Sequence, residues 1–363
     1  MLDVDVVRCP AGPFHRSPFW CRRWWEPEAT DRRHGLTLRD LNNRQETPHA
    51  RPQARAIGRF LDTGSVVNNT CTPEEDRAAV AGDAVSGSEK RRAAVLGSPI
   101  RHSLSPTLHR TAYAALGLTG WSYDAMECDE AALPAFVEQL GPEWAGLSLT
   151  MPLKRVALTV ADEVSALAHA VGAANTLLLG QRGEPRRAEN TDVAGILAAL
   201  REAGVDRVSA SVVLGAGGTA QAALAALREL GETTPTVLVR DPSRTADLRA
   251  AADRLGVAPM ISGGLLDGEI PDAEVIISTL PPGAADALSR QLWVGRPVVL
   301  DVVYTPWPTP LAASAITAGC PTVSGLAVLL HQAVAQCELM TGRPAPTAQM
   351  RAALDAAVTR QPG

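Results

Sequence analysis

From Ala93 onward, the chain alternates short apolar runs with longer stretches in which apolar residues recur every three or four positions. The short runs are typical of buried strands and the longer stretches of amphipathic helices, so the pattern predicts an α/β protein. The predicted strands cover residues 93–96, 122–128, 146–149, 175–179, 210–214, 236–239 and 322–324. The predicted helices cover residues 105–116, 130–140, 192–203, a segment that ends at 230, 326–341 and 347–357.

The spacing of these elements divides the α/β region into two domains. From residue 210 the pattern becomes strictly strand, glycine turn and helix, which is typical of a doubly wound, Rossmann-like domain. We therefore place one α/β domain at residues 93–192 and a Rossmann-like domain at residues 193–325. The C-terminal helices within 326–363 repeat apolar residues every four positions, and we expect them to pack back on the first domain and complete it.

Residues 1–92 differ from the rest of the chain. Proline and arginine occur throughout this segment, no sustained helical or strand period is visible, and Trp20, Trp24 and Trp25 lie among arginines. A segment of this kind cannot assemble a core of its own, so we expect an extension that is disordered, or translated leader sequence ahead of a start near Arg91. The alternative is a regulatory arm that binds a partner through its tryptophans.

Composition narrows the function classes. The 363 residues are 46% hydrophobic, which is enough for a sizeable core. The net charge of -5 gives no basic footprint for nucleic acid or an anionic membrane. No apolar run of about 18 residues and no signal-peptide pattern are present, so we expect a soluble, cytoplasmic protein. The six cysteines lack metal-ligand or disulfide spacing, which predicts reduced thiols and no metal site, and the sequence leaves a homodimer open.

A glycine-rich turn follows the predicted strand 210–214 and opens a helix. It would bind a dinucleotide through Gly215, Ala216, Gly217, Gly218, Thr219 and Ala220. In this context Gly215 permits the tight turn, Gly217 lets the backbone approach a pyrophosphate, and Ala220 allows the helix to pack closely on the strand. The alternative is a glycine turn in a βαβ unit that binds no ligand.

The end of the next strand bears on the choice of cofactor. NAD sites usually place a carboxylate there, whereas this strand ends in Arg240, and Arg244 follows four residues later. Two guanidinium groups suit the 2′-phosphate of NADP, so NADP is the predicted cofactor. Asp241 lies between them and keeps NAD open, and a merely solvated charged turn is the alternative to both.

The first domain carries four polar strings, at residues 97–106, 148–154, 172–176 and 190–192. Each string follows or adjoins a predicted strand, where loops gather into a site. In this order and spacing, together with residues 301–306 and the segment 324–333, they closely resemble the shikimate dehydrogenase family. The resemblance covers essentially the whole chain from Ala93 onward. It implies NADPH-dependent, reversible reduction of 3-dehydroshikimate to shikimate in aromatic amino-acid biosynthesis.

The resemblance assigns roles to individual residues. Lys154 and Asp192 would be the catalytic pair. The carboxylate and hydroxyls of the substrate would be bound by Ser103, Ser105, Thr150, Asn175, Tyr304 and Gln332. Two features depart from the family: Ser148 stands where asparagine is usual, and the extension 1–92 has no counterpart in the ordinary enzyme.

The residue types fit the chemistry. Oxidising a secondary alcohol requires a group that exchanges a proton within hydrogen-bond reach of the oxygen, which lysine can do and arginine cannot. The chain has only two lysines, Lys90 and Lys154, so a lysine in the body of the protein is unusual. The structural alternatives are a solvated Lys154, helix caps at Asp192 and Ser105, and a turn at Asn175. His102, His109 and His331 lack the carboxylate partners of a triad, and we assign them no catalytic role.

Two other functions stay open at this point. One is an NAD-dependent quinate/shikimate dehydrogenase, although the pair Ser103 and Ser105 favours shikimate. The other is a non-catalytic NADP-binding regulator on the same fold, against which Lys154 and Asp192 argue. In the regulator, the arm with its tryptophans and arginines would be the contact surface. For the enzyme the expected partner is a small-molecule substrate, and neither nucleic acid nor membrane is expected.

Overall fold

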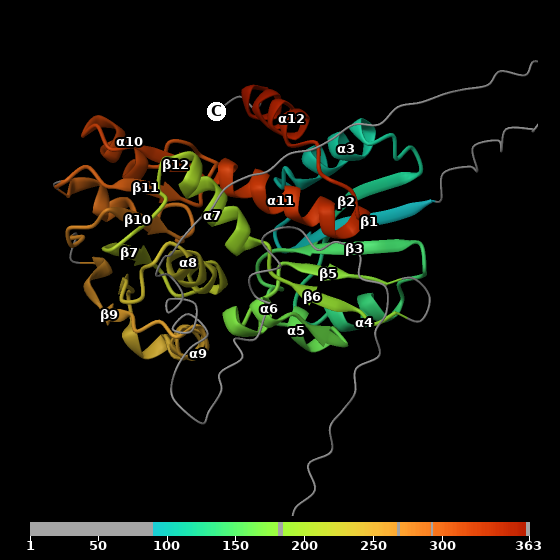
Figure 1. The fold of residues 1–363 in the computed structure, drawn as a ribbon, viewed down its shortest axis with the longest axis horizontal. Helices are drawn as coiled ribbons and strands as arrows, with labels where there is room; N and C mark the ends of the chain where they lie inside the picture. The colour runs from blue at the N-terminus through green and yellow to red at the C-terminus, as the bar shows by residue number, and fades with distance from the viewer. Residues whose placement is uncertain (1–89, 181–183, 267–268, 292, 361–363) are drawn as a thin grey trace, which may run out of the picture. The chain divides into compact units, whose positions relative to one another are not determined.

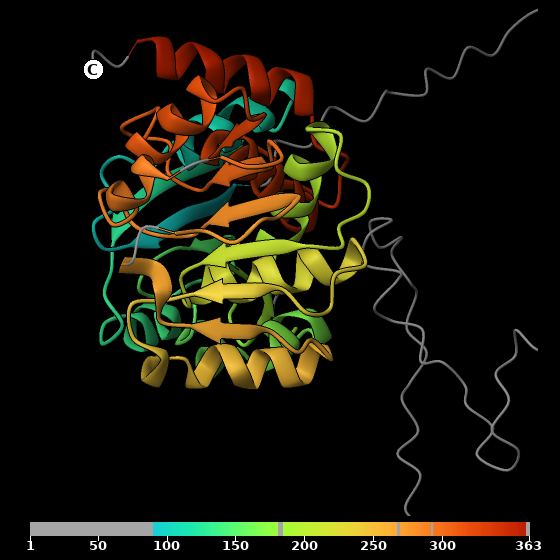
Figure 2. The same ribbon diagram turned by 90° about the vertical axis from the view of Figure 1, so that its left-hand side faces the viewer.

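The computed structural model describes residues 90–180, 184–266, 269–291 and 293–360. The extension predicted to be disordered therefore lies outside the described residues up to position 89, as does its tryptophan cluster. The described residues form two six-stranded sheets flanked by helices (Figures 1 and 2). This arrangement confirms the predicted α/β class.

The first sheet comes from the N-terminal part of the described chain. Its strands are β1 (Arg91–Gly97), β2 (Trp121–Glu127), β3 (Trp144–Leu149), β4 (Glu163–Val164), β5 (Thr176–Leu178) and β6 (Arg187–Glu189). They lie in the order β2–β1–β3–β5–β6–β4. β1 runs parallel to β2 and β3, whereas β5 runs antiparallel to both of its neighbours. The helices of this region are α3 (Ser105–Ala115), α4 (Leu133–Glu138), α5 (Ala157–Val160), α6 (Ala166–Val171) and α7 (Asp192–Glu202).

The second sheet is entirely parallel. Its strands are β7 (Ser211–Leu214), β8 (Thr236–Leu238), β9 (Met260–Ser262), β10 (Val275–Ser278), β11 (Val298–Asp301) and β12 (Thr322–Ser324). Their order, β12–β11–β10–β7–β8–β9, is the doubly wound order of dinucleotide-binding domains and confirms the predicted Rossmann-like fold. The strand order reverses between β7 and β10, because β8 and β9 follow on one side of β7 and β10, β11 and β12 follow on the other. Sheets of this kind bind their ligands at this point, beyond the carboxyl ends of the strands.

The helices of the second half pack on the second sheet and on elements of the first half. They are α8 (Gly218–Glu229), α9 (Ala246–Leu255), α10 (Pro310–Thr317), α11 (Gly325–Thr341) and α12 (Thr347–Thr359), with short 3-10 turns η1 (Pro242–Arg244), η2 (Gly264–Leu266) and η3 (Asp286–Arg290). α7 and α11 pack against each other between the sheets, and α12 packs on α3 (Figure 1). Gly195 makes this possible, because a Cβ there would lie 2.8 Å from the backbone oxygen of Val328.

Alanine explains how α8 fits into this arrangement. Residues 220–227 of α8 are all buried, which is unusual for a helix because one face normally meets solvent. Five of these eight residues are alanine, whose small side chain lets a helix approach a sheet and other helices on several sides. The N-terminus of α8 is thereby held between the two sheets.

The structure moves the start of the folded chain. We predicted that the extension would reach residue 92, but Arg91 and Arg92 belong to β1 and pair with β2 and β3. Aromatic rings on the neighbouring strands explain the difference. The guanidinium carbon of Arg91 lies 5.9 Å from the ring centroid of Trp121, and that of Arg92 lies 4.5 Å from the ring centroid of Trp144. These cation–π contacts let two charged residues continue an otherwise apolar strand.

Ser105 and Asp192, considered above as helix caps, are each the first residue of a helix instead. Ser105 is the first residue of α3 and not its cap, and the hydroxyl of Ser103 accepts a hydrogen bond from the Ser105 backbone N–H at 3.3 Å. Asp192 is likewise the first residue of α7. Asn190 accepts a hydrogen bond from the Val193 N–H at 3.3 Å, which leaves the Asp192 carboxylate free for other partners.

Candidate active site

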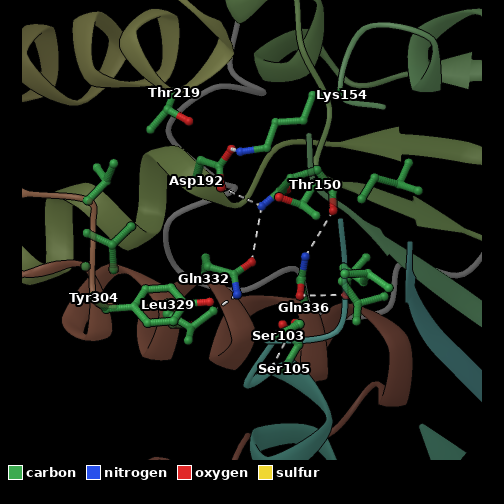
Figure 3. Close-up of a pocket in the computed structure, with 18 of the residues that line it drawn as sticks. Ser103, Ser105, Thr150, Lys154, Asp192, Thr219, Tyr304, Leu329, Gln332 and Gln336 are labelled. Atoms are coloured by element: carbon green, nitrogen blue, oxygen red, sulfur yellow. Dashed lines mark hydrogen bonds and ion pairs between the residues drawn. The ribbon is translucent and has the colours of Figure 1, made fainter. Parts of the chain in front are cut away.

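A cavity of about 350 Å³ lies where the two sheets and α11 meet (Figure 3). All eight residues predicted to act on the substrate line this one cavity, although they come from distant parts of the sequence. They are Ser103, Ser105, Thr150, Lys154, Asn175, Asp192, Tyr304 and Gln332. Thr219, from the predicted nucleotide loop, lines it too. The structure therefore brings the predicted substrate residues and part of the predicted cofactor loop to one place.

Lys154 and Asp192 form an ion pair inside this cavity. The Lys154 Nζ atom lies 2.6 Å from Asp192 Oδ2, and the two side chains are 19% and 9% exposed. Lys154 lies in the turn after β3, and its backbone oxygen accepts a hydrogen bond from Ala174 N–H at 2.8 Å. This bond ties the turn to the segment that leads into Asn175. A lysine held in this way beside a carboxylate can give or take a proton at a substrate oxygen.

Asn175 connects the ion pair to its surroundings. Its Nδ2 atom donates to Asp192 Oδ1 at 2.9 Å and to Thr191 Oγ1 at 2.8 Å, and it lies 3.3 Å from Gln332 Oε1. Its Oδ1 atom accepts from the Thr191 N–H at 2.7 Å. Because a backbone N–H can only donate, this contact fixes the orientation of the amide. Asn175 is 2% exposed, and it therefore orients the carboxylate rather than closing a turn.

The other end of the cavity carries hydroxyl groups. In Figure 3, Ser103 and Ser105 lie at the end of the cavity away from Lys154. Gln332 and Gln336 lie between Lys154 and the two serines. Tyr304 lines the same cavity, and burial raises the pKa of its hydroxyl, so it stays protonated at neutral pH and can donate a hydrogen bond. Hydroxyl donors of this kind suit a carboxylate on the ligand.

Asp301 supports the loop that carries Tyr304. Its Oδ1 atom accepts from the Val303 N–H at 3.2 Å and its Oδ2 atom accepts from the Thr309 hydroxyl at 2.8 Å. The carboxyl group is 2% exposed, and burial raises its pKa above the ordinary value. The two hydrogen bonds hold both ends of the loop between β11 and α10.

Sequence reasoning missed several buried polar residues behind the cavity. Gln336 lines the cavity one helical turn after Gln332, and it contacts Ser148, Thr176 and His109. A usable signal was present, because glutamines four residues apart on a helix lie on the same face. Tyr123 was missed because an alternating strand pattern does not show that its hydroxyl meets a partner.

The glycine turn has the geometry of a nucleotide loop. Gly215 has a φ of +107°, and a Cβ there would lie 2.7 Å from Thr279 Oγ1, so only glycine fits. A Cβ at Gly217 would meet nothing within 4 Å, and no side chain caps the first turn of α8. The helix N-terminus therefore presents backbone N–H groups to open space, which favours an anion. A Cβ at Gly218 would lie 3.7 Å from Lys154 Cδ, so the loop adjoins the ion pair.

The predicted 2′-phosphate site lies beyond β8. Arg240 and Arg244 are both exposed and follow this strand closely. Asp241 Oδ1 accepts hydrogen bonds from the Ser243 hydroxyl at 2.6 Å and the Ser243 N–H at 2.9 Å, and so caps the turn η1. These bonds, and then the charge of Arg244, lower the pKa of Asp241. The carboxylate is thus engaged locally, while the guanidinium groups face solvent.

Three further observations concern metals, membranes and thiols. Among the described residues, no three or more histidine, cysteine, aspartate or glutamate side chains are grouped so as to hold a metal ion. No helix in the described part of the chain has the length and apolar character needed to cross a membrane. Cys128, Cys320 and Cys337 are buried free thiols.

Comparison with known proteins agrees with this geometry. A family profile described as "Shikimate dehydrogenase substrate binding domain" matches residues 95–177, and one described as "Shikimate 5'-dehydrogenase C-terminal domain" matches residues 325–354. A curated relative from Rhizobium meliloti, named "Shikimate dehydrogenase (NADP(+))", is 38% identical over 250 residues, which are 66% of this chain and 85% of the relative.

Solved structures give the same result. The shikimate dehydrogenase of Mycobacterium tuberculosis is 47% identical with a TM-score of 0.67, and the match covers 74% of this chain and 99% of that one. The Thermus thermophilus enzyme, solved in complex with NADP(H) and shikimate, is 32% identical with a TM-score of 0.62 and the same two coverages. The chain belongs to the shikimate dehydrogenase family.

Proposed function

We propose that the protein is an NADP-dependent shikimate dehydrogenase, which catalyses the reversible reduction of 3-dehydroshikimate to shikimate. The observation that carries this proposal is the ion pair of Lys154 and Asp192, 2.6 Å apart in a cavity that the nucleotide loop also lines. Curated relatives named as NADP-dependent shikimate dehydrogenases support the same substrate and cofactor.

In the proposed mechanism the bound NADPH supplies the hydride. Lys154 donates a proton from Nζ to the oxygen of the carbonyl group, and it takes a proton from the hydroxyl group in the reverse direction. Asp192 accepts a hydrogen bond from Nζ through Oδ2 and orients it toward the substrate. Asn175 holds the other carboxylate oxygen, so the carboxylate cannot rotate away from the lysine.

The remaining cavity residues would bind the substrate. We assign the substrate carboxylate to Ser103, Ser105 and Tyr304, because hydroxyl donors gather at that end of the cavity. The ring hydroxyls fall to Thr150, Asn175 and Gln332 near the ion pair. Asn175 has three acceptors around an amide nitrogen with only two hydrogens, so its longest contact, 3.3 Å to Gln332, is the one a substrate hydroxyl would replace.

The chain also fits NADP at the glycine turn. The open space at Gly217 and the uncapped first turn of α8 would take the pyrophosphate. Arg240 and Arg244 would bind the 2′-phosphate. The Asp241 carboxylate accepts hydrogen bonds from Ser243, so it does not compete with the phosphate for these arginines.

Steady-state kinetics of the full chain tests the proposal with shikimate and quinate, each with NADP and with NAD. We expect kcat/KM to be highest for shikimate with NADP. Replacing shikimate with quinate, or NADP with NAD, should lower kcat/KM by at least about tenfold, because an enzyme discriminates strongly against a ligand that leaves its polar groups unpaired. A preference for quinate with NAD would instead favour the function named for the Corynebacterium glutamicum quinate dehydrogenase, which is 28% identical with a TM-score of 0.62. The absence of turnover with all four combinations would favour a non-catalytic regulator. The cytoplasmic location and a homodimer stay predictions of the sequence.

A further inference from the structure

Gln336 occupies a buried position at the back of the cavity. It lies on α11, one turn after Gln332 (Figure 3), and its residue is 1% exposed. Its Nε2 atom donates to the backbone oxygen of Asn175 and to Thr176 Oγ1, both at 3.0 Å. Its Oε1 atom accepts from the Ser148 hydroxyl at 2.8 Å and lies 3.4 Å from His109 Nε2. All four hydrogen-bonding positions of the amide are therefore occupied by protein groups.

The orientation of this amide follows from its partners. The backbone oxygen of Asn175 can only accept, so the nitrogen of Gln336 must face it and the oxygen must face Ser148. With no position left for a ligand, Gln336 does not bind substrate directly. Its contribution to the reaction can only be made through the residues that it holds.

Those residues lead directly to the ion pair. Tyr123 donates to Ser148 at 2.6 Å, and burial keeps the tyrosine protonated by raising its pKa. On the far side of Gln336, the Thr176 hydroxyl donates to Asn175 Oδ1 at 3.0 Å, and Asn175 Nδ2 donates to Asp192. The hydrogen bonds thus form one buried, uncharged network from β2 to the catalytic carboxylate, in which each partner fixes the next.

The strand register shows which two positions Gln336 bridges. Ser148 on β3 and Thr176 on β5 are directly opposite each other. Cβ atoms in such a pair lie about 5 Å apart, close enough for two hydroxyls to bond to each other, but here each hydroxyl bonds to the Gln336 amide instead. An asparagine at position 148 would be longer by one heavy atom and could reach Thr176 directly. Here Gln336 enters from α11 and bonds to both.

We infer that Gln336 is a positioning residue for the reaction and that it replaces the bridging contact that a longer polar side chain at position 148 would make. Loss of its amide would leave Thr176 without its fixed partner and would loosen Asn175, so Asp192 would hold Lys154 in the productive orientation less often. This inference rests on the proposed function, because it concerns the rate of that reaction.

The first test replaces Gln336 with methionine, which has similar length and no amide. We expect kcat for shikimate oxidation to fall by about tenfold while KM changes by less than about twofold, because the residue holds the proton-transfer pair and not the substrate. Cys337→Ala is the matched control, since Cys337 is also fully buried on α11 but lies outside the network. It should lower the melting temperature and leave kcat unchanged. Wild-type kcat in folded Gln336→Met would overturn the inference.

The second test exchanges the bridge. Ser148→Asn alone should lower kcat, because the added atom would approach Gln336 Oε1, which is only 2.8 Å from the serine oxygen. In combination with Gln336→Ala, the same asparagine should restore kcat to within about threefold of the wild type. A double variant no faster than Gln336→Ala alone would contradict the proposed replacement. If the Gln336 variants fail to fold, Thr176→Val removes the same link with little change in shape, and it should reproduce the loss of kcat.

A structural readout separates this inference from the proposed function. If the wild-type chain does not oxidise shikimate, the proposed function fails, and the network is then judged by the crystal structure of Gln336→Met. We expect the 2.9 Å contact between Asn175 Nδ2 and Asp192 Oδ1 to lengthen or break. An unchanged contact would show that Gln336 does not position Asn175.

Discussion

Acidification should destabilise the fold through His109, a fully buried histidine on α3. Burial lowers its pKa from 6.5 to about 4, and its hydrogen bond to Gln336 offsets this only in part. The ring stacks on Tyr123 with a centroid distance of 4.1 Å, and its Nδ1 atom has no hydrogen-bond partner in the described structure. Protonation would place an unpartnered N–H and a charge in the core, so the folded state keeps the ring neutral.

The sign and size of the effect follow from proton linkage. Below pH 6.5 the unfolded chain binds a proton at this histidine and the folded chain does not, so the free energy of unfolding falls as the pH decreases toward 4 and levels off below it. One pKa unit corresponds to about 1.4 kcal/mol, and the loss from this single site is about 2 kcal/mol between pH 7.5 and pH 5, and about 3 kcal/mol at pH 4.

Urea denaturation of the wild type and His109→Gln at several pH values measures this loss. The glutamine cannot titrate, so the difference in unfolding free energy between the two proteins should change by about 2 kcal/mol from pH 7.5 to pH 5. Acids such as Glu189, whose pKa is raised by burial, titrate in both proteins and cancel. His102→Gln is the control, since His102 is exposed. Parallel curves for the wild type and His109→Gln would refute the reasoning.

Three further outcomes are expected. Lys154→Ala should lower kcat by roughly 10²- to 10⁴-fold with a smaller effect on KM for shikimate, and an unchanged kcat would remove this lysine from the mechanism. Replacing Arg240 and Arg244 together with glutamine should weaken NADP binding by about 2 to 4 kcal/mol in titration calorimetry and leave NAD binding nearly unchanged, whereas equal losses would show that they do not bind the 2′-phosphate. Deleting residues 2–89 should preserve turnover, because all described residues that line the cavity lie at or after Val95, and an inactive, folded truncation would contradict this.

The sequence predicted the strands and motifs better than the contacts between them. Some strands with several consecutive apolar residues, such as β7, were placed within one or two residues of their positions, but β10 and β11, which are equally apolar, were not predicted. The short strands β4 and β6 were missed, because two or three partly polar residues carry no local period and gain their stability from distant strands. Arg91 and Arg92 were assigned to the extension for a similar reason, since Trp121 and Trp144 contact them only in the folded sheet.

For the site, too, the sequence predicted the individual residues better than the contacts between them. The residues that the family resemblance assigned to the substrate do gather in one cavity, because most of them lie in loops or at helix starts just beyond strand ends, while Asn175 directly precedes β5 and Gln332 lies on α11. Behind them, Gln336 had a local signal in its spacing of four residues from Gln332, but its meeting with Ser148 and Tyr123 could not be read from local sequence. Ser148, Gln336 and Tyr123 come from three elements, and only the register of the sheet and the packing of α11 bring their side chains together.

The kcat of Lys154→Arg for shikimate oxidation tests the central claim most directly. Arginine keeps the positive charge beside Asp192 but cannot exchange a proton near neutral pH. If Lys154 transfers the proton, kcat should fall by at least about 10²-fold while the Kd for NADP stays within about twofold of the wild type. Wild-type kcat in this variant would show that the residue only provides charge and that the proton moves by another route.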